Sequence, residues 1–80
     1  MKELDLKGLK CPLPVLRLQR FIRDHLDIGG QVEVSTTDPM SQLDIPHYCN
    51  DSGQKLISSD LNEDVCIFIV EKQIHISQNQ

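Results

Sequence analysis

The sequence has 80 residues, of which 39% are hydrophobic, and a net charge of −4 at pH 7. A chain this short has apolar material for only one core, so we expect a single globular domain over residues 1–80. No apolar run approaches the roughly 20 residues of a membrane-spanning helix, and the N-terminus lacks a signal-peptide pattern. We therefore expect a monomeric cytoplasmic protein that does not insert into a membrane.

The first third of the chain predicts a strand followed by a helix. Apolar and polar residues alternate over residues 2–6, which is typical of a strand with one buried face. The helix is expected to begin with Cys11 as its N-cap, because Pro12 and Pro14 then occupy positions at which a missing N–H breaks no helical hydrogen bond. Apolar residues at helical spacing follow, and the glycines at 29–30 end the helix.

The middle of the chain predicts a second strand and an interrupted helical region. The strand is expected over residues 31–35, where apolar and polar residues again alternate. Pro46 should interrupt the helical region that follows, because a proline inside a helix removes one hydrogen bond. Asp44 can cap a restart, which predicts a separate turn over residues 40–43 before a helix over residues 45–50.

The last third predicts two antiparallel strands. Residues 56–57 belong to the first, residues 60–64 form a turn, and residues 65–70 are apolar on both faces, as in an interior strand. Alternation over residues 73–77 predicts a continuation of that strand. The order β-α-β-α-β-β predicts an α/β (α+β) two-layer sandwich, with both helices on one face of a four-stranded mixed sheet.

Cys11 is the strongest candidate for chemistry. A cysteine is nucleophilic as the thiolate, and its pKa falls at a helix N-terminus near cations. The expected helix start places the Leu13 N–H as a donor to the sulfur, with Lys10 nearby. The alternative is that Cys11 merely begins a helix and behaves as a small hydrophobic residue. The position alone leaves both interpretations open, because exposure decides between them.

The charge is distributed unevenly along the chain. Residues 1–23 hold six cations and two carboxylates, a net charge of +4, whereas the remainder holds two cations and ten carboxylates, a net charge of −8. Scattered charges are usually solvated faces. Because the basic segment surrounds Cys11, however, we expect Lys10 and Arg17 to assist the docking of a partner protein.

The remaining candidates are better explained by structure. Cys49 and Cys66 fall at a helix end and in the most apolar strand, so packing is the favoured role for both, with a second reactive thiol at Cys49 as the alternative. Asp38 and Asp44 precede proline-marked helix starts and are explained by capping. The histidines lack metal-ligand spacing, and neither a metal nor another cofactor is implied.

The chain resembles the TusA/SirA-like sulfur-carrier family. Residues 8–14, Gly-Leu-Lys-Cys-Pro-Leu-Pro, match its Gly-Leu-x-Cys-Pro-x-Pro signature, and residues 37–39 and 44–49 are similar to its second block. The resemblance implies that Cys11 receives sulfane sulfur as a persulfide from a cysteine desulfurase or a rhodanese-like donor. It also implies that Cys11 passes this sulfur to an acceptor protein, in transfer RNA thiolation or in sulfur or selenium metabolism.

Two other functions compete with sulfur transfer. Small sandwiches of this topology also bind RNA, but a negative net charge and three aromatic residues, one tyrosine and two phenylalanines, give little phosphate attraction or base stacking. We therefore expect no direct contact with nucleic acid. The other alternative is a regulatory or adaptor module that binds a partner protein and in which Cys11 is modified without relaying sulfur.

Overall fold

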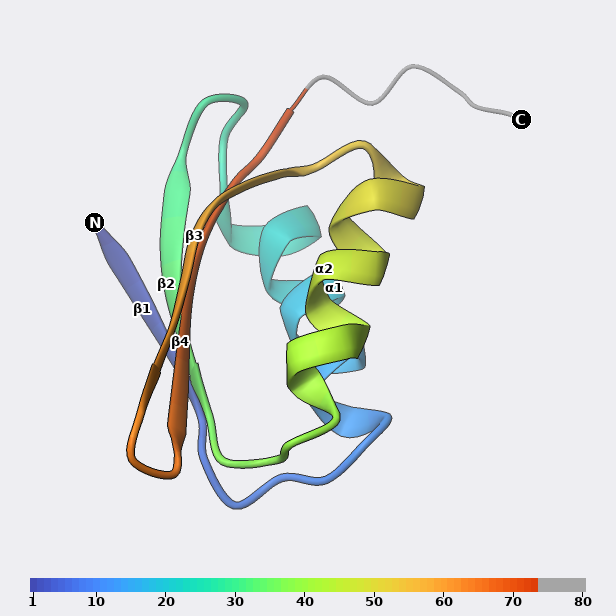
Figure 1. Ribbon diagram of the computed structural model, residues 1–80. Helices are drawn as coiled ribbons and strands as arrows, with labels where there is room; N and C mark the ends of the chain where they lie inside the picture. The colour runs from blue at the N-terminus through green and yellow to red at the C-terminus, as the bar shows by residue number, and fades with distance from the viewer. Residues whose placement is uncertain (74–80) are drawn as a thin grey trace.

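The computed structural model of the protein describes residues 1–73 and has two layers. Both helices cover the same face of a four-stranded mixed sheet, as the sequence predicts (Figure 1). The elements in chain order are β1 (Lys2–Leu6), α1 (Leu13–His25), β2 (Gln31–Thr36), α2 (Ser41–Ser52), β3 (Lys55–Asn62) and β4 (Val65–Glu71). The predicted continuation beyond residue 73 lies outside the described residues. In the part of the chain that is described, no helix is long and apolar enough to cross a membrane.

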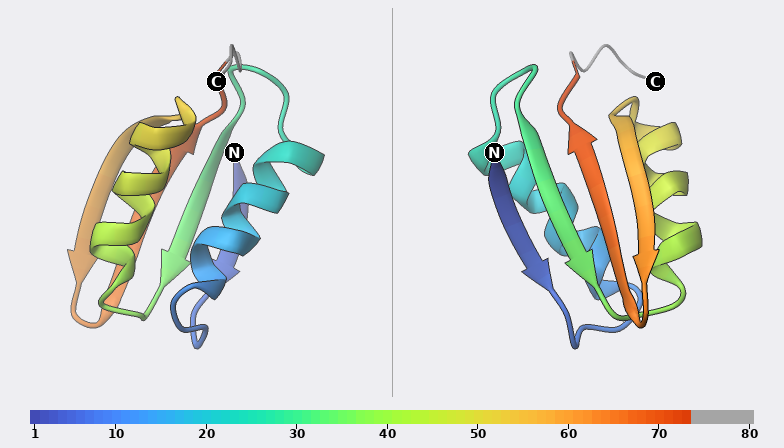
Figure 2. Two further views of the ribbon diagram at one scale, coloured as in Figure 1. Left: turned by 90° about the vertical axis from the view of Figure 1, so that its right-hand side faces the viewer. Right: turned by 60° about the vertical axis from the view of Figure 1, so that its left-hand side comes forward.

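The strands lie in the order β1-β2-β4-β3 (Figure 2). β1 pairs with β2 in parallel, and Lys2 to Leu6 lie opposite Val32 to Thr36. β4 is antiparallel to both of its neighbours, β2 and β3, which confirms the expected antiparallel pair at the end of the chain. Because β1 and β2 run in the same direction, the connections that leave them toward α1 and α2 meet at one end of the molecule.

The core fills the space between the helices and the sheet. Alternate residues of β2 and β4 face the helices, and α1 buries a stripe at helical spacing. The buried apolar residues are Leu6, Leu18, Ile22, Leu26, Val32, Val34, Ile45, Cys49, Cys66, Phe68 and Val70. This core fixes both helices against the sheet, and with them the connections at their N-termini.

The predicted interruption of the second helical region is wrong, because α2 continues through Pro46. Proline removes one N–H, which leaves only the carbonyl of Gln42 without its helical donor. Gln42 is exposed, so water can satisfy that carbonyl. Ile45 and Cys49 are buried on the same side of the helix, on either side of the proline in the sequence. Their packing against the core therefore outweighs the lost hydrogen bond.

Candidate functional site

Cys11 lies in the connection between β1 and α1, at the end of the molecule where β1 and β2 terminate. Its backbone N–H donates to a carboxylate oxygen of Asp38, whose other oxygen accepts the N–H of Met40 at 3.1 Å. The buried hydroxyls of Thr36 and Ser41 are hydrogen bonded to each other, and Ser41 Oγ donates to the Asp38 carbonyl at 2.6 Å. These contacts fix Asp38 and, through it, the backbone of Cys11.

The thiol of Cys11 is exposed and donates a hydrogen bond to Asp44 in the first turn of α2. The distance from Cys11 Sγ to Asp44 Oδ2 is 2.9 Å. This hydrogen bond raises the pKa of the Cys11 thiol, and partial desolvation and the negative charges of Asp44 and Asp38 act in the same direction. The expectation of a lowered pKa is therefore wrong, because the charged groups that act on the sulfur are two carboxylates and not the neighbouring cations.

The start of α1 also differs from the prediction. The helix begins at Leu13 with Pro12 as its N-cap, so Cys11 precedes the cap instead of forming it. The Leu13 N–H donates to the carbonyl of Lys10 at 2.8 Å and is not available to the sulfur. Pro14 lies in the first turn, as expected, and is buried. The cap differs because Lys10, Cys11 and Pro12 form a turn that satisfies the Leu13 N–H within the connection.

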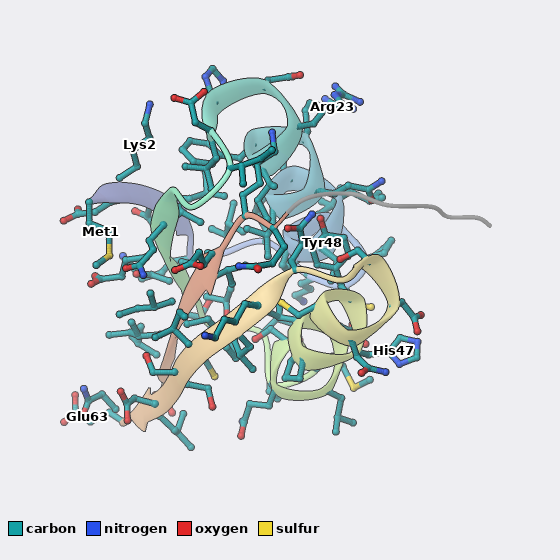
Figure 3. The ribbon with its side chains drawn as sticks, turned by 90° about the horizontal axis from the view of Figure 1, so that it is seen from above. Met1, Lys2, Arg23, His47, Tyr48 and Glu63 are labelled. Atoms are coloured by element: carbon teal, nitrogen blue, oxygen red, sulfur yellow. The ribbon has the colours of Figure 1, made fainter. Side chains whose placement is uncertain are left out.

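An open groove of about 330 Å³ adjoins the thiol. Its lining residues are Cys11, Pro12, Val15, Asp44, His47, Tyr48 and Asp51. His47 and Asp51 form an ion pair at 3.0 Å when the imidazole is protonated, and both side chains are largely exposed. His47 points outward from α2 (Figure 3), whereas Tyr48 packs against the core and its pKa is raised by burial. One wall of this groove is therefore uncharged and belongs to the α1 side, and the other is polar and belongs to α2.

Lys10 and Arg17, the predicted docking residues, are both exposed. Neither forms an ion pair within residues 1–73. Arg17 lies about one turn beyond Leu13 on α1, so the two cations flank the start of the helix that follows Cys11. This placement leaves them available to a partner, although they do not contact the thiol.

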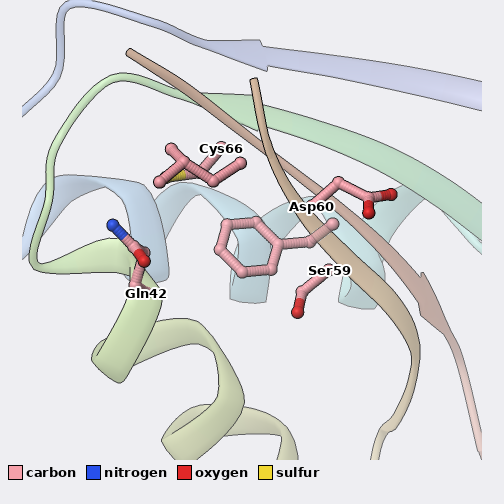
Figure 4. A pocket seen from close by; sticks show the side chains of 6 residues that line it. Gln42, Ser59, Asp60 and Cys66 are labelled. Carbon is pink, nitrogen blue, oxygen red and sulfur yellow. The ribbon is translucent and has the colours of Figure 1, made fainter. Parts of the chain in front are cut away.

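Cys49 and Cys66 are buried, as expected for packing residues. Burial raises the pKa of the Cys49 thiol to about 11. Cys66 lies beneath a separate shallow hollow between the start of α2 and the β3–β4 pair (Figure 4). Gln42 and Asp60 are among the other residues that line this hollow. Of the three cysteines in the chain, Cys11 alone is exposed.

Sequence reasoning missed the contact between Asp44 and Cys11 and the groove beside it. Capping alone accounts for Asp44 in the sequence, because it lies 33 residues from Cys11 in the chain. The available signal was the parallel pairing of the first two strands, which brings the connections that follow them to one end of the sheet. Within residues 1–73 no group of three or more His, Cys, Asp or Glu side chains could hold a metal ion.

Comparisons with known proteins identify relatives over nearly the whole chain. The family model described as "Sulfurtransferase TusA" matches residues 2–72. The sulfur carrier protein TusA of Pseudomonas syringae pv. syringae is 38% identical over 71 residues, which are 89% of this chain and 83% of that protein. A protein of the same name from Pseudomonas putida is 36% identical over 70 residues, which are 88% of this chain and 86% of the relative.

Two solved structures share the fold. A SirA-like protein from Desulfitobacterium hafniense superimposes with a TM-score of 0.78 at 20% identity, over 92% of this chain and 100% of that one. The solution structure of HP1264 from Helicobacter pylori gives a TM-score of 0.69 at 22% identity, over 92% of this chain and 100% of that one. At such identities the likeness shows the arrangement of strands and helices and nothing further.

Proposed function

We propose that this chain, which belongs to the TusA family of sulfurtransferases, carries sulfur as a persulfide on Cys11 and passes it to an acceptor protein. The observation that supports this role is the contrast in exposure, since Cys11 is exposed and the other two cysteines are buried. A carrier needs a thiol that two different proteins can reach in turn. The curated relatives are named sulfur carriers, in agreement with this interpretation.

The proposed chemistry is an exchange at sulfur. The Cys11 thiolate attacks the outer sulfur of a persulfide on the donor, a new S–S bond forms at Cys11, and the donor's S–S bond breaks to leave a thiolate. Attack by an acceptor thiolate on the outer sulfur of the Cys11 persulfide repeats these steps. No net oxidation takes place, so the exchange needs no cofactor. A cysteine desulfurase or a rhodanese-like protein supplies such a donor, and the reducing conditions of the cytoplasm keep the Cys11 thiol available.

Docking, rather than enclosure of a small molecule, gives the carrier its specificity in this proposal. The groove beside Cys11 is open, and Lys10 and Arg17 are exposed on either side of the start of α1 in the sequence. Cations at these positions attract a partner surface that carries carboxylates. The acceptor belongs to a relay that ends in transfer RNA thiolation or in sulfur or selenium metabolism.

Mass spectrometry of the Cys11 peptide tests the proposal. The protein is incubated with a cysteine desulfurase and cysteine, or with a rhodanese and thiosulfate, and is then alkylated without reduction. We expect the mass of one added sulfur on Cys11 and none on Cys49 or Cys66. A loaded Cys49 with an unmodified Cys11 would contradict the assignment. Loading of Cys11 that no acceptor thiol ever removes would instead support a regulatory module whose thiol is modified without relay.

A further inference from the structure

Two carboxylates hold Cys11, one at its backbone and one at its thiol. Asp38 accepts the backbone N–H, and Asp44 Oδ2 lies 2.9 Å from Cys11 Sγ. A carboxylate accepts hydrogen bonds and donates none, so this contact exists only while the sulfur carries its proton. A hydrogen bond made by the neutral form of an acid favours that form over the charged one. The contact therefore opposes formation of the thiolate that sulfur exchange requires.

The groups that face the thiol supply little positive charge that would favour the thiolate. Asp38 approaches from the β2–α2 connection, and Asp44, His47 and Asp51 line the groove from α2, together with the half-buried Tyr48. The α1 side contributes only Pro12 and Val15, which are uncharged. The charge of a protonated His47 is directed to Asp51 at 3.0 Å. Lys10 precedes Cys11 in the chain, but its exposed side chain forms no ion pair with either carboxylate in the described residues.

We propose that Asp44 is a positioning residue that keeps the unloaded Cys11 thiol protonated, and that a lysine or arginine of the sulfur donor releases the thiol by pairing with this carboxylate. An ion pair with Asp44 removes the hydrogen-bond acceptor and offsets the negative charge beside the sulfur. The first half of the proposal concerns the free protein alone. The second half rests on the proposed function, because it requires a sulfur donor that docks at Cys11.

The proposed step is balanced in atoms and charge. When Asp44 pairs with the donor's cation, the Cys11 thiol loses its proton to water, and the thiolate attacks the donor persulfide. The donor's leaving thiolate takes up one proton. The loaded Sγ then carries no hydrogen, so its hydrogen bond to Asp44 cannot form again. Repulsion between the carboxylate and a terminal persulfide anion favours an orientation of the outer sulfur away from α2, where an acceptor can reach it.

The first test needs no partner protein. The rate of Cys11 alkylation by iodoacetamide is measured against pH by peptide mass spectrometry for the wild type, Asp44→Asn and the control Asp60→Asn. Asp60 is exposed on β3 and lines the separate hollow beside Cys66, so this control removes the same charge away from the Cys11 thiol. We expect the midpoint of the profile to fall only in Asp44→Asn, with severalfold faster alkylation near neutral pH. Equal midpoints in all three proteins would overturn the role of Asp44.

A second measurement uses only the wild-type sequence and therefore does not depend on whether a variant folds. The Cβ carbon of Cys11 is titrated by NMR in the wild-type protein and in a peptide of residues 7–15. We expect the higher pKa in the folded protein, because the peptide lacks Asp38 and Asp44. The same or a lower pKa in the folded protein would contradict the proposal without use of any variant.

The release step is tested with two sulfur sources. Asp44→Asn should react severalfold faster than wild type with inorganic polysulfide, which is too small to supply a docked cation. Loading by a cysteine desulfurase with cysteine should not rise in parallel, because the donor already releases the wild-type thiol. An equal increase with both sources would refute release by the donor. Failure of the proposed function is distinguishable, since a desulfurase would then load neither protein while the alkylation profiles still differ.

Discussion

Cys11 and Cys49 are two thiols whose pKa values are both raised, for different physical reasons. A hydrogen bond to Asp44 has this effect on the exposed Cys11, whereas burial raises the pKa of Cys49 to about 11. A partner protein can replace a hydrogen bond at the surface, but only unfolding reverses burial. Access, more than the direction of the pKa shift, therefore separates the candidate reactive thiol from the structural one.

The largest expected effect comes from Cys11→Ser. This variant should lose sulfur loading completely, because an oxygen nucleophile does not form a persulfide. Its fold should remain intact, since the side chain is exposed. Peptide mass spectrometry after incubation with a desulfurase measures loading, and circular dichroism measures the fold. Sulfur loading of the Cys11→Ser variant at the wild-type level would mean that another thiol is the carrier.

The Cys49→Ser variant tests the structural role of the buried thiol. A hydroxyl at this buried position without a hydrogen-bond partner costs on the order of 1 to 3 kcal/mol of unfolding free energy. Urea denaturation measures the loss, and Asn50→Ser, at the exposed neighbouring position of α2, serves as the control. The folded fraction of Cys49→Ser should still load sulfur on Cys11. Unchanged stability with lost transfer would reveal a second reactive thiol.

Charge reversal at Lys10 and Arg17 should slow sulfur transfer to Cys11 only by slowing the association of this protein with its sulfur donor. The double change to glutamate should lower the rate of transfer from the protein donor by about tenfold at low salt, with a smaller effect as screening increases. A matched control reverses Lys2 and Lys55, which lie at the other end of the sheet and change the net charge equally. Stopped-flow kinetics at several ionic strengths measure both variants. Equal effects of the two double reversals on the transfer rate would show that Lys10 and Arg17 are solvated residues without a docking role.

The last expected effect is a pH dependence of the unfolding free energy that arises from Cys49. Because the folded-state pKa is about 11 and the ordinary value is 9.0, the folded protein binds more protons than the unfolded chain between these values. The contribution of the protonated Cys49 thiol to the unfolding free energy is fully present below pH 9. It should be lost as pH rises toward 11, by on the order of 2 kcal/mol. Urea denaturation of wild type and Cys49→Ala isolates the effect. Parallel curves for the two proteins would contradict it.

The sequence is sufficient for most of the fold but not for the environment of Cys11. Period-two alternation and the position of Gly29 and Gly30 depend on local residues, and they predict β1, β2 and the end of α1 correctly. The turn expected over residues 60–64 is shorter than predicted, because β3 continues to Asn62 through its pairing with β4. The prediction at Pro46 is wrong because local propensity does not include the tertiary packing of α2. The expectation of a lowered pKa for the Cys11 thiol is wrong for the same reason, since the carboxylates that contact Cys11 follow a different strand.

The connections that meet at the thiol also couple its chemistry to the folding of an edge strand. Gly8 donates its N–H to Thr37 Oγ1 at 2.9 Å, across 29 positions of sequence, and β1 is held in the sheet by β2 alone. Loop-closure entropy must be overcome before such non-local contacts form. We expect detachment of β1 to loosen the connection that carries Cys11, and so to weaken its contacts with Asp38 and Asp44, while α2 and the rest of the sheet persist. Destabilising substitutions near Lys2 should therefore change the alkylation profile of a sulfur at the opposite end of that strand.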